Sequence, residues 1–192
     1  MIKILGGVAK GFPLFTPRSD TVRPTSVIVK RKLFDWRQHL HGHQFIDLCA
    51  GSGSMGFEAL SRGAEKIAVN DSLRGAFLTL KQNQEQMVNK FQFDPAMIVV
   101  SNSEAKHWVT KELKYQFPDT SKAILYLDPP YENRKLYFEI MDALKAAGYE
   151  GEVWLESERL KGIKLEEATG AFHSVIKTVE QGDHFVVIGK VI

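Results

Sequence analysis

The stretch FIDLCAGSGSMGFEALSRGA, residues 45–64, joins a short apolar run to a glycine-rich turn and then to an amphipathic segment. Gly51, Gly53 and Gly56 fit the pattern G-x-G-x-x-G, in which missing side chains permit a tight turn and let backbone N–H groups at a helix start approach a ligand. The stretch therefore predicts a strand, a ligand-binding loop and a helix, in this order. A glycine-rich turn without a ligand is the alternative, and the flanking strand and helix patterns make it the weaker one.

Short apolar runs separated by longer amphipathic segments fill the chain from residue 44 onward. The runs are QFIDLC, KIAVN, MIVV, AILYLD and EVWLE. This alternation is typical of an α/β fold, in which helices cover both faces of a mainly parallel sheet. The last segment, HSVIKTVEQGDHFVVIGKVI, has two strand-like runs around Gln181-Gly182-Asp183, which predicts an antiparallel hairpin at the end of the sheet.

The first 43 residues have a different pattern. IKIL and FPLF flank GGVAKG, which predicts a small hairpin with a basic residue at its tip. A helix with Thr25 or Ser26 as its cap is predicted over TSVIVKRKLFDWRQHL, because its apolar residues are three or four apart and its outer face is basic. We therefore predict a hairpin and helix extension at residues 1–43 and an α/β domain at residues 44–192.

Charge is distributed unevenly, although the net charge is only +2. The first 43 residues hold eight Lys or Arg against two acids, and the rest of the chain holds 17 against 21. A basic extension before a mildly acidic body is typical of a protein that binds a polyanion, and a solvated basic surface is an equal alternative. The candidate phosphate-binding residues are Lys10, Arg18, Arg23, Lys30 and Arg31.

The composition is that of a globular protein, with 192 residues of which 44% are hydrophobic and 25% are charged. The chain has neither the apolar run that a membrane span requires nor the features of a secretion signal. Its one cysteine excludes an internal disulfide and suits a reducing cytoplasm. His39, His41 and His43 have no carboxylate or thiol beside them, so we expect no metal site. We expect a cytoplasmic monomer.

Two ligand classes compete for the glycine loop. A dinucleotide places its ribose on an acid about 20 residues after the loop, and Asn70-Asp71 stand near that distance. S-adenosylmethionine has no phosphate. Asp47 suits its charged amino-acid end, the second strand's polar end suits its ribose, and Asn102 and Ser103 suit its adenine edge. The loop alone does not decide between these ligands.

The stretch AILYLDPPYENRK, residues 123–135, decides between them. Its apolar run predicts a strand whose carboxyl end faces the ligand of an open parallel sheet. Asp128, Pro129 and Pro130 form a stiff corner that presents oxygens without competing donors, which suits the exocyclic amine of a base. Once Asp128 and the Pro129 carbonyl accept its hydrogens, the amine can turn its lone pair toward a methyl group, and Tyr131 can stack on the flipped base. A dehydrogenase has no use for this corner.

The chain resembles a known family over nearly its whole length. GGVAKGFPLFTP, RPTS, FIDLCAGSGSMGFEALSRGA, VVSNSEA, LDPPY and WLESE occur in the order seen in the bacterial 16S rRNA guanine-N2 methyltransferases of the guanine-966 type. The resemblance implies a seven-stranded, Rossmann-like class I methyltransferase fold and S-adenosylmethionine as methyl donor, with S-adenosylhomocysteine as product and no metal. It also implies 16S rRNA as partner, free or in a small-subunit particle, and a hairpin that helps to hold RNA.

The resemblance also implies roles for the matching residues. The methionine side of the pocket would be Asp47, Gly51, Gly53 and Gly56, with Ala50 and Ser52 of the same loop as further cofactor-binding candidates. The ribose side would be Asn70 and Asp71, the adenine side Asn102 and Ser103, and the target-amine site Asp128, Pro129, Pro130 and Tyr131. Apart from the resemblance, Glu156 and Glu158 in WLESE follow the fifth strand; we interpret them as scaffold or solvent-facing residues, with a place in the lining of the base pocket as the alternative.

Two alternatives stay open. An adenine-N6 methyltransferase acting on DNA or RNA would use the same corner, although the chain lacks a separate target-recognition domain. An RNA-binding relative that no longer transfers methyl groups is the other. It is motivated by Val27-Ile28, where the family usually has Asp-Arg after RPTS, and by Asn70, where the family commonly has Glu.

Overall fold

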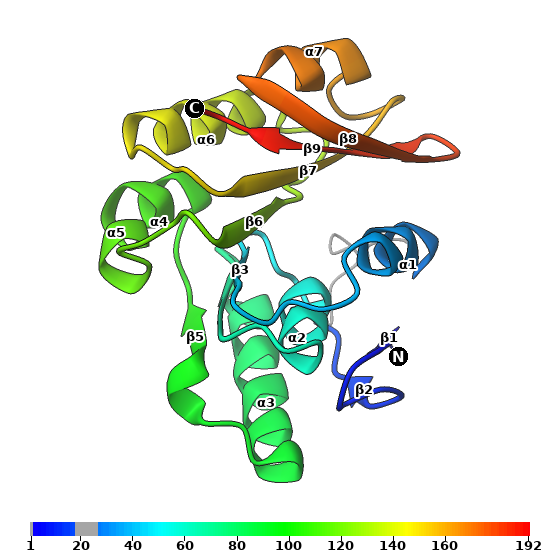
Figure 1. Cartoon of the computed structure of the whole chain (residues 1–192), viewed down its shortest axis with the longest axis vertical. Helices are drawn as coiled ribbons and strands as arrows, with labels where there is room; N and C mark the ends of the chain where they lie inside the picture. The colour runs from blue at the N-terminus through cyan, green and yellow to red at the C-terminus, as the bar shows by residue number, and fades with distance from the viewer. Residues whose placement is uncertain (1, 18–26) are drawn as a thin grey trace. The chain divides into compact units, whose positions relative to one another are not determined.

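The computed structural model describes residues 2–17 and 27–192. The chain divides into two compact units, Met1–Ser103 and Glu104–Ile192, which are described in turn (Figure 1). The boundary that the sequence predicts, between residues 43 and 44, lies within the first unit and stays a prediction.

The first unit holds a small hairpin, a three-stranded parallel sheet and the helices that connect its strands. Its elements are β1 (Ile2–Lys3), β2 (Pro13–Leu14), α1 (Val27–Trp36), β3 (Gln44–Asp47), α2 (Ser54–Ser61), β4 (Lys66–Asn70), α3 (Arg74–Phe91), the 3-10 helix η1 (Pro95–Met97) and β5 (Ile98–Ser101). The strand order is β5-β4-β3, and both neighbouring pairs are parallel, as the alternating pattern predicts. Helix α2 packs on β3 and β4, and α3 packs on β5.

The predicted N-terminal hairpin is confirmed, because β1 and β2 pair antiparallel. It lies against the end of α2, where Val8 N–H donates to the Ser61 carbonyl and Ala9 N–H donates to the Ser61 hydroxyl, each at 2.9 Å. Helix α1 ends at Trp36, earlier than predicted, because Leu40 N–H turns away to donate to the Arg62 carbonyl. The predicted caps of this helix lie outside the described residues.

The second unit holds four strands and four helices among its described residues. They are α4 (Ala105–Lys111), α5 (Leu113–Gln116), β6 (Ala123–Leu127), α6 (Arg134–Ala146), β7 (Glu152–Glu158), α7 (Leu165–Gly170), β8 (Ser174–Gln181) and β9 (His184–Lys190). Strands β6 and β7 are parallel, whereas β9 pairs antiparallel with both β7 and β8. The turn between β8 and β9 contains Gly182 at a φ of 58°, which confirms the predicted C-terminal hairpin.

The α/β fold class is confirmed. The two units supply three and four strands, the seven that the resemblance implies. Each of the five apolar runs forms a strand, and the large side chains of four of them are buried, as in Phe45, Ile67 and Trp154, whereas β5 at the edge buries only Ile98. The carboxyl ends of β3, β4 and β5 carry the polar residues of the first unit's candidate site, and the loop after β6 carries those of the second.

Candidate active site

The glycine loop follows β3 and leads into α2 (Figure 1). Gly53 precedes the helix with a φ of 75°, and a Cβ there would lie 2.6 Å from the Phe57 ring. At Gly56, a Cβ would lie 2.5 Å from Cγ1 of Val69, so this glycine lets α2 pack closely on β4. The turn and the packing of the helix therefore both require glycine here.

Asp47, the last residue of β3, is buried behind this loop. Its Oδ2 accepts a hydrogen bond from the Gly56 N–H at 3.0 Å, so it holds the first turn of α2. Burial raises its pKa from 3.8 to about 7, the Asp71 carboxylate acts in the same direction, and the Lys30 ammonium opposes the rise. The carboxylate lacks full compensation by positive charge, and a cationic ligand nearby would lower its pKa again.

Asn70, at the end of β4, clamps the ends of three strands. Its Nδ2 donates to the Leu48 carbonyl at 3.0 Å and to the Ser103 carbonyl at 2.9 Å. Its Oδ1 accepts from the Ser101 hydroxyl at 3.0 Å and from the Ser103 N–H at 3.1 Å. Both donors and both acceptor positions of the amide are used. Asn70 therefore has none left for the ribose contact that the sequence predicts. A glutamate could not donate the two bonds that this asparagine provides.

Asp71 is the strand-end residue that faces the glycine loop. Its Oδ2 accepts from the Gly51 N–H at 2.8 Å, and its Oδ1 accepts from the Leu73 N–H at 2.9 Å. Burial raises its pKa. Asn102 reaches across from the end of β5 and donates to the Asp71 and Ser72 carbonyls at 2.7 and 2.9 Å. The structure therefore brings the glycine loop, Asp71 and Asn102 together.

Two buried polar residues, whose contacts the sequence analysis missed, tie the N-terminal segment to the glycine loop and to α2. Asn83 of α3 accepts from the Phe15 N–H at 2.8 Å and donates to the Phe15 and Ser52 carbonyls at 3.0 and 2.9 Å. Lys30 of α1 lies 3.0 Å from Glu58 and donates to the Ser54 carbonyl at 2.8 Å. Lys30 is predicted to contact phosphate, and this prediction is wrong, because its ammonium is buried in an ion pair.

The Asp-Pro-Pro-Tyr corner follows β6 in the second unit. Asp128 is partly exposed, Pro129 is buried and Pro130 is exposed. The Pro129 carbonyl accepts a hydrogen bond from the Tyr137 hydroxyl of α6 at 3.3 Å, which leaves it one lone pair. The Pro130 carbonyl accepts from the Asn133 N–H at 2.9 Å, so the corner is part of a tight turn.

Tyr131 belongs to a polar cluster that the sequence analysis also missed. Its hydroxyl lies 3.3 Å from Nδ1 of His184 on β9, which lies 3.8 Å from Oε1 of Glu156 on β7. The Tyr126 hydroxyl donates to the other oxygen of Glu156. Both Glu156 and Glu158 are buried, so neither faces solvent, and burial raises the pKa of Glu156 to about 7. Side chains two residues apart on a strand share a face, so Glu156 lies on the same face as buried Trp154. This spacing was the signal in the sequence that Glu156 is buried.

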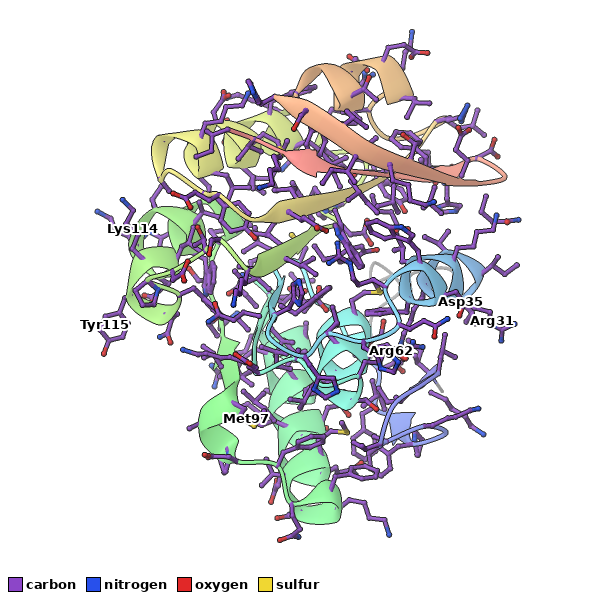
Figure 2. The ribbon with its side chains drawn as sticks, in the orientation of Figure 1. Arg31, Asp35, Arg62, Met97, Lys114 and Tyr115 are labelled. Carbon is purple, nitrogen blue, oxygen red and sulfur yellow. The ribbon has the colours of Figure 1, made fainter. Side chains whose placement is uncertain are left out.

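The candidate RNA-binding residues separate into three groups. Lys10 is exposed in the loop of the hairpin, and Arg31 is exposed on α1 near Asp35 (Figure 2). Lys30 is buried, as described above. Arg18 and Arg23 lie outside the described residues. Two of the five candidates are therefore placed where a phosphate could reach them.

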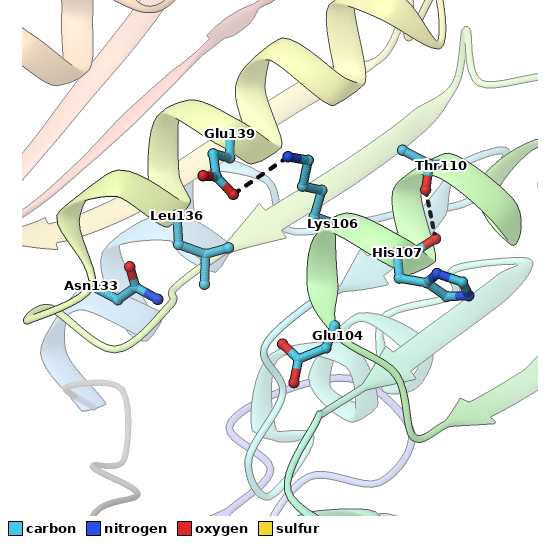
Figure 3. Close-up of a pocket in the computed structure, with 7 residues that line it drawn as sticks. All are labelled: Glu104, Lys106, His107, Thr110, Asn133, Leu136 and Glu139. Atoms are coloured by element: carbon cyan, nitrogen blue, oxygen red, sulfur yellow. Dashed lines mark hydrogen bonds and ion pairs between the residues drawn. The ribbon is translucent and has the colours of Figure 1, made fainter.

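A groove of about 510 Å³ lies between α4 and the start of α6 in the second unit (Figure 3). Its wall includes the ion pair between Lys106 and Glu139, with a distance of 3.5 Å. It contains none of the predicted site residues. Over residues 2–17 and 27–192, no cluster of three or more His, Cys, Asp or Glu side chains could hold a metal ion, and no helix is long and apolar enough to cross a membrane.

Comparisons with known proteins identify relatives over most of the chain. The family described as Conserved hypothetical protein 95 matches residues 2–188. Ribosomal RNA small subunit methyltransferase D of Escherichia coli K12 is 31% identical over 183 residues, which cover 90% of this chain and 82% of that protein. The protein of the same name from Haemophilus influenzae is 37% identical over 103 residues, 48% of this chain and 53% of its own.

Solved structures with a similar fold include methyltransferases. The Escherichia coli protein yhhF, provisionally described as a methyltransferase, has a TM-score of 0.76 and 26% identity over 97% of this chain and 96% of its own. Trm1 from Pyrococcus horikoshii, solved in complex with S-adenosyl-L-methionine, has a TM-score of 0.61 and 14% identity over 99% of this chain and 62% of its own. The chain therefore belongs to the Conserved hypothetical protein 95 family, with ribosomal RNA small subunit methyltransferase D proteins as relatives and a class I methyltransferase fold.

Proposed function

We propose that this chain transfers a methyl group from S-adenosylmethionine to the exocyclic N2 amine of a guanine in 16S ribosomal RNA. The names of its relatives support rRNA methylation. The observation that carries the chemistry is the Asp-Pro-Pro-Tyr corner after β6, with a partly exposed carboxylate and a proline carbonyl that retains a free lone pair. The N2 amine is our choice between two exocyclic amines that this corner fits.

The first unit suits S-adenosylmethionine because, within residues 2–17 and 27–192, neither Asp47 nor Asp71 forms an ion pair. Burial raises the pKa of both Asp47 and Asp71, and a ligand with a sulfonium and an ammonium group would supply the missing charge. Each oxygen of Asp71 accepts one backbone N–H and can accept a ribose hydroxyl as well. Asn102 would meet the adenine edge. When bound, the cofactor supplies an electrophilic methyl group.

In the second unit, Asp128 and the Pro129 carbonyl would each accept one hydrogen of the target amine. This arrangement turns the nitrogen lone pair toward the methyl group and holds it there, so that most of the catalysis is positioning. As positive charge develops on the nitrogen, the Asp128 carboxylate stabilises it and takes up the proton that leaves. Tyr131 stacks on the base once the base has left its helix.

The experiment that tests the proposal is methyl transfer to 16S rRNA in vitro. The purified chain is incubated with S-adenosylmethionine carrying an isotopic label and with free 16S rRNA or isolated small subunits, and the labelled nucleoside is identified by mass spectrometry. We expect N2-methylguanosine. N6-methyladenosine would favour the adenine alternative, and tight RNA binding without transfer would favour the relative that no longer transfers methyl groups.

Asp128→Asn tests the assignment of the carboxylate. The variant keeps the shape and one acceptor oxygen but loses the charge, so we expect the transfer rate to fall at least about 100-fold, as for a removed charge-stabilising group. S-adenosylmethionine binding, measured by calorimetry, should be retained. Asp142→Asn, at an exposed position of α6, is the matched control. Unchanged turnover by Asp128→Asn would remove this carboxylate from the mechanism.

A further inference from the structure

Tyr131, His184 and Glu156 come from three separate segments of the second unit. Tyr131 lies in the loop after β6, Glu156 lies on β7 and His184 begins β9. Strands β7 and β9 are paired antiparallel, with Glu158 directly opposite His184. The C-terminal hairpin thus supplies a side chain that contacts the Asp-Pro-Pro-Tyr corner, although about 50 residues of chain separate them.

The contacts form a chain that runs from the corner into the interior. The Tyr131 hydroxyl lies 3.3 Å from Nδ1 of His184, and the two rings are 6.1 Å apart at an angle of 59°, so the rings are tilted and not stacked. Nδ1 in turn lies 3.8 Å from Oε1 of Glu156. The exposed fraction of the side chain falls from 35% for His184 to 1% for Glu156, so this series of contacts leads inward.

Glu156 is an unusual choice for its position. Within the described residues its buried Oε1 accepts no hydrogen bond, and its Oε2 accepts one from the Tyr126 hydroxyl; the Tyr131 hydroxyl also interacts with this carboxylate and counters the rise of its pKa that burial causes. A buried acceptor without a partner costs about 1–3 kcal/mol, so stability alone does not favour a carboxylate here. A buried polar group that lowers stability calls for another role. The oxygen without a hydrogen bond is the one that faces His184.

We propose that His184 and Glu156 are positioning residues for Tyr131: Glu156 orients the imidazole, and the imidazole holds the Tyr131 hydroxyl, which fixes the position of the ring on which the target base stacks. This inference rests on the proposed function. Neither residue touches the base. The C-terminal hairpin is thereby part of the methyl-transfer machinery and not only a closing element of the sheet.

The state of the Tyr131 phenol fits this role. Burial and the neighbouring carboxylates of Asp128, Glu156 and Glu158 hold its pKa well above the usual range, so it keeps its proton and remains a hydrogen-bonding partner for the imidazole. A tyrosine side chain has two rotatable bonds between its ring and the backbone. The hydroxyl lies on the axis of the bond nearer the ring, so a contact there restricts the bond nearer the backbone. This contact fixes where the ring lies and leaves its faces free for a base.

A double-mutant cycle tests the proposal, because it isolates the coupling of two residues. The variants are Tyr131→Phe, His184→Ala and their combination. Each is measured at saturating RNA and S-adenosylmethionine in single-turnover methyl transfer, so that the rate and not the affinity is compared. We expect each single change to lower the rate about tenfold, the scale of one hydrogen bond, and the combination to lower it about tenfold as well, because both remove the same contact.

Two further variants separate positioning from a loss of folding. His184→Asn places an amide near the position of Nδ1, so its transfer rate should be at least about threefold higher than that of His184→Ala. His173→Ala, in an exposed position before β8, is the matched control and should leave the rate unchanged. For His184→Ala, the affinity for S-adenosylmethionine in calorimetry and the free energy of unfolding in urea should change too little to explain the loss of rate.

The outcomes distinguish the inference from the proposed function. If the unaltered chain transfers methyl groups but the double variant loses rate about 100-fold, the two single losses multiply. That result would overturn the inference and leave the proposed function standing. An unchanged rate in His184→Ala would overturn it as well. If the unaltered chain transferred no methyl group to RNA, the proposed function would fall, and the inference that rests on it would fall too.

Discussion

Replacing Asp47 with asparagine should make the ligand-free protein more stable at neutral pH. The carboxylate is buried, and its pKa rises from 3.8 to about 7 because burial disfavours the charge. Asparagine has nearly the same shape and keeps an oxygen that can accept the Gly56 N–H, but it carries no charge that must be desolvated. The variant removes the desolvation penalty and keeps one acceptor oxygen for the Gly56 and Met55 N–H groups, both of which donate to this carboxylate.

The size and the pH dependence of the gain follow from the two pKa values. Protonated Asp47 causes no penalty, so the gain is near zero well below pH 3.8. It grows as the unfolded chain ionises, and it levels off above the folded pKa of about 7. The values correspond to a gain of about 2 kcal/mol at pH 5 and about 4 kcal/mol at pH 8. Any effect of the amide on packing is the same at both pH values and cancels in the difference.

The assay is urea unfolding of wild type and Asp47→Asn at pH 5 and pH 8, without S-adenosylmethionine. The free energy of unfolding of the variant, relative to wild type, should rise by about 2–3 kcal/mol between the two pH values. Asp35→Asn, on the exposed side of α1, is the matched control and should change by less than about 0.5 kcal/mol (Figure 2). A relative stability that stays flat or falls with pH would refute the reasoning.

Three further predictions concern the first unit. Asn70→Ala removes four hydrogen bonds at the strand ends and should lower the free energy of unfolding by about 2–4 kcal/mol in urea unfolding; a loss below about 1 kcal/mol would contradict the clamp. Gly53→Ala should destabilise by about 1–3 kcal/mol and weaken S-adenosylmethionine binding in calorimetry, whereas Gly75→Ala, where a Cβ meets no described heavy atom within 4 Å, should do neither. Changing both Lys10 and Arg31 to Gln should weaken binding to rRNA and flatten its salt dependence by about 2 in logarithmic slope; an unchanged slope in filter binding would remove both from the RNA contact.

The sequence was sufficient to predict the strands because each has an unambiguous apolar run. All five parallel-type runs and the C-terminal hairpin are found where they are predicted. The glycine pattern was equally informative, since the turn before α2 and the close packing of that helix on β4 exclude larger residues. Local patterns of this kind contain their own physical reason.

The polar interior could not be predicted in the same way. Lys30 lies in a segment rich in basic residues, and only the tertiary fold brings it within 3.0 Å of Glu58, 28 positions along the chain. Asn70 follows a strand like a ligand-binding residue, yet its four hydrogen bonds go to neighbouring strand ends. Glu156 and His184 meet through strand pairing alone. Such contacts depend on long-range register, which a single sequence does not display.

Each unit keeps one buried carboxylate that an amide could replace with a gain in stability. Burial raises the pKa of Asp47 in the first unit and of Glu156 in the second to about 7. A chain shaped by stability alone would carry Asn and Gln there, since a neutral amide avoids desolvation of a charge. Asp47 lies behind the glycine loop, and Glu156 lies behind Tyr131 of the Asp-Pro-Pro-Tyr corner. These two desolvated carboxylates are therefore better explained by what they hold during methyl transfer than by what they add to the stability of the fold.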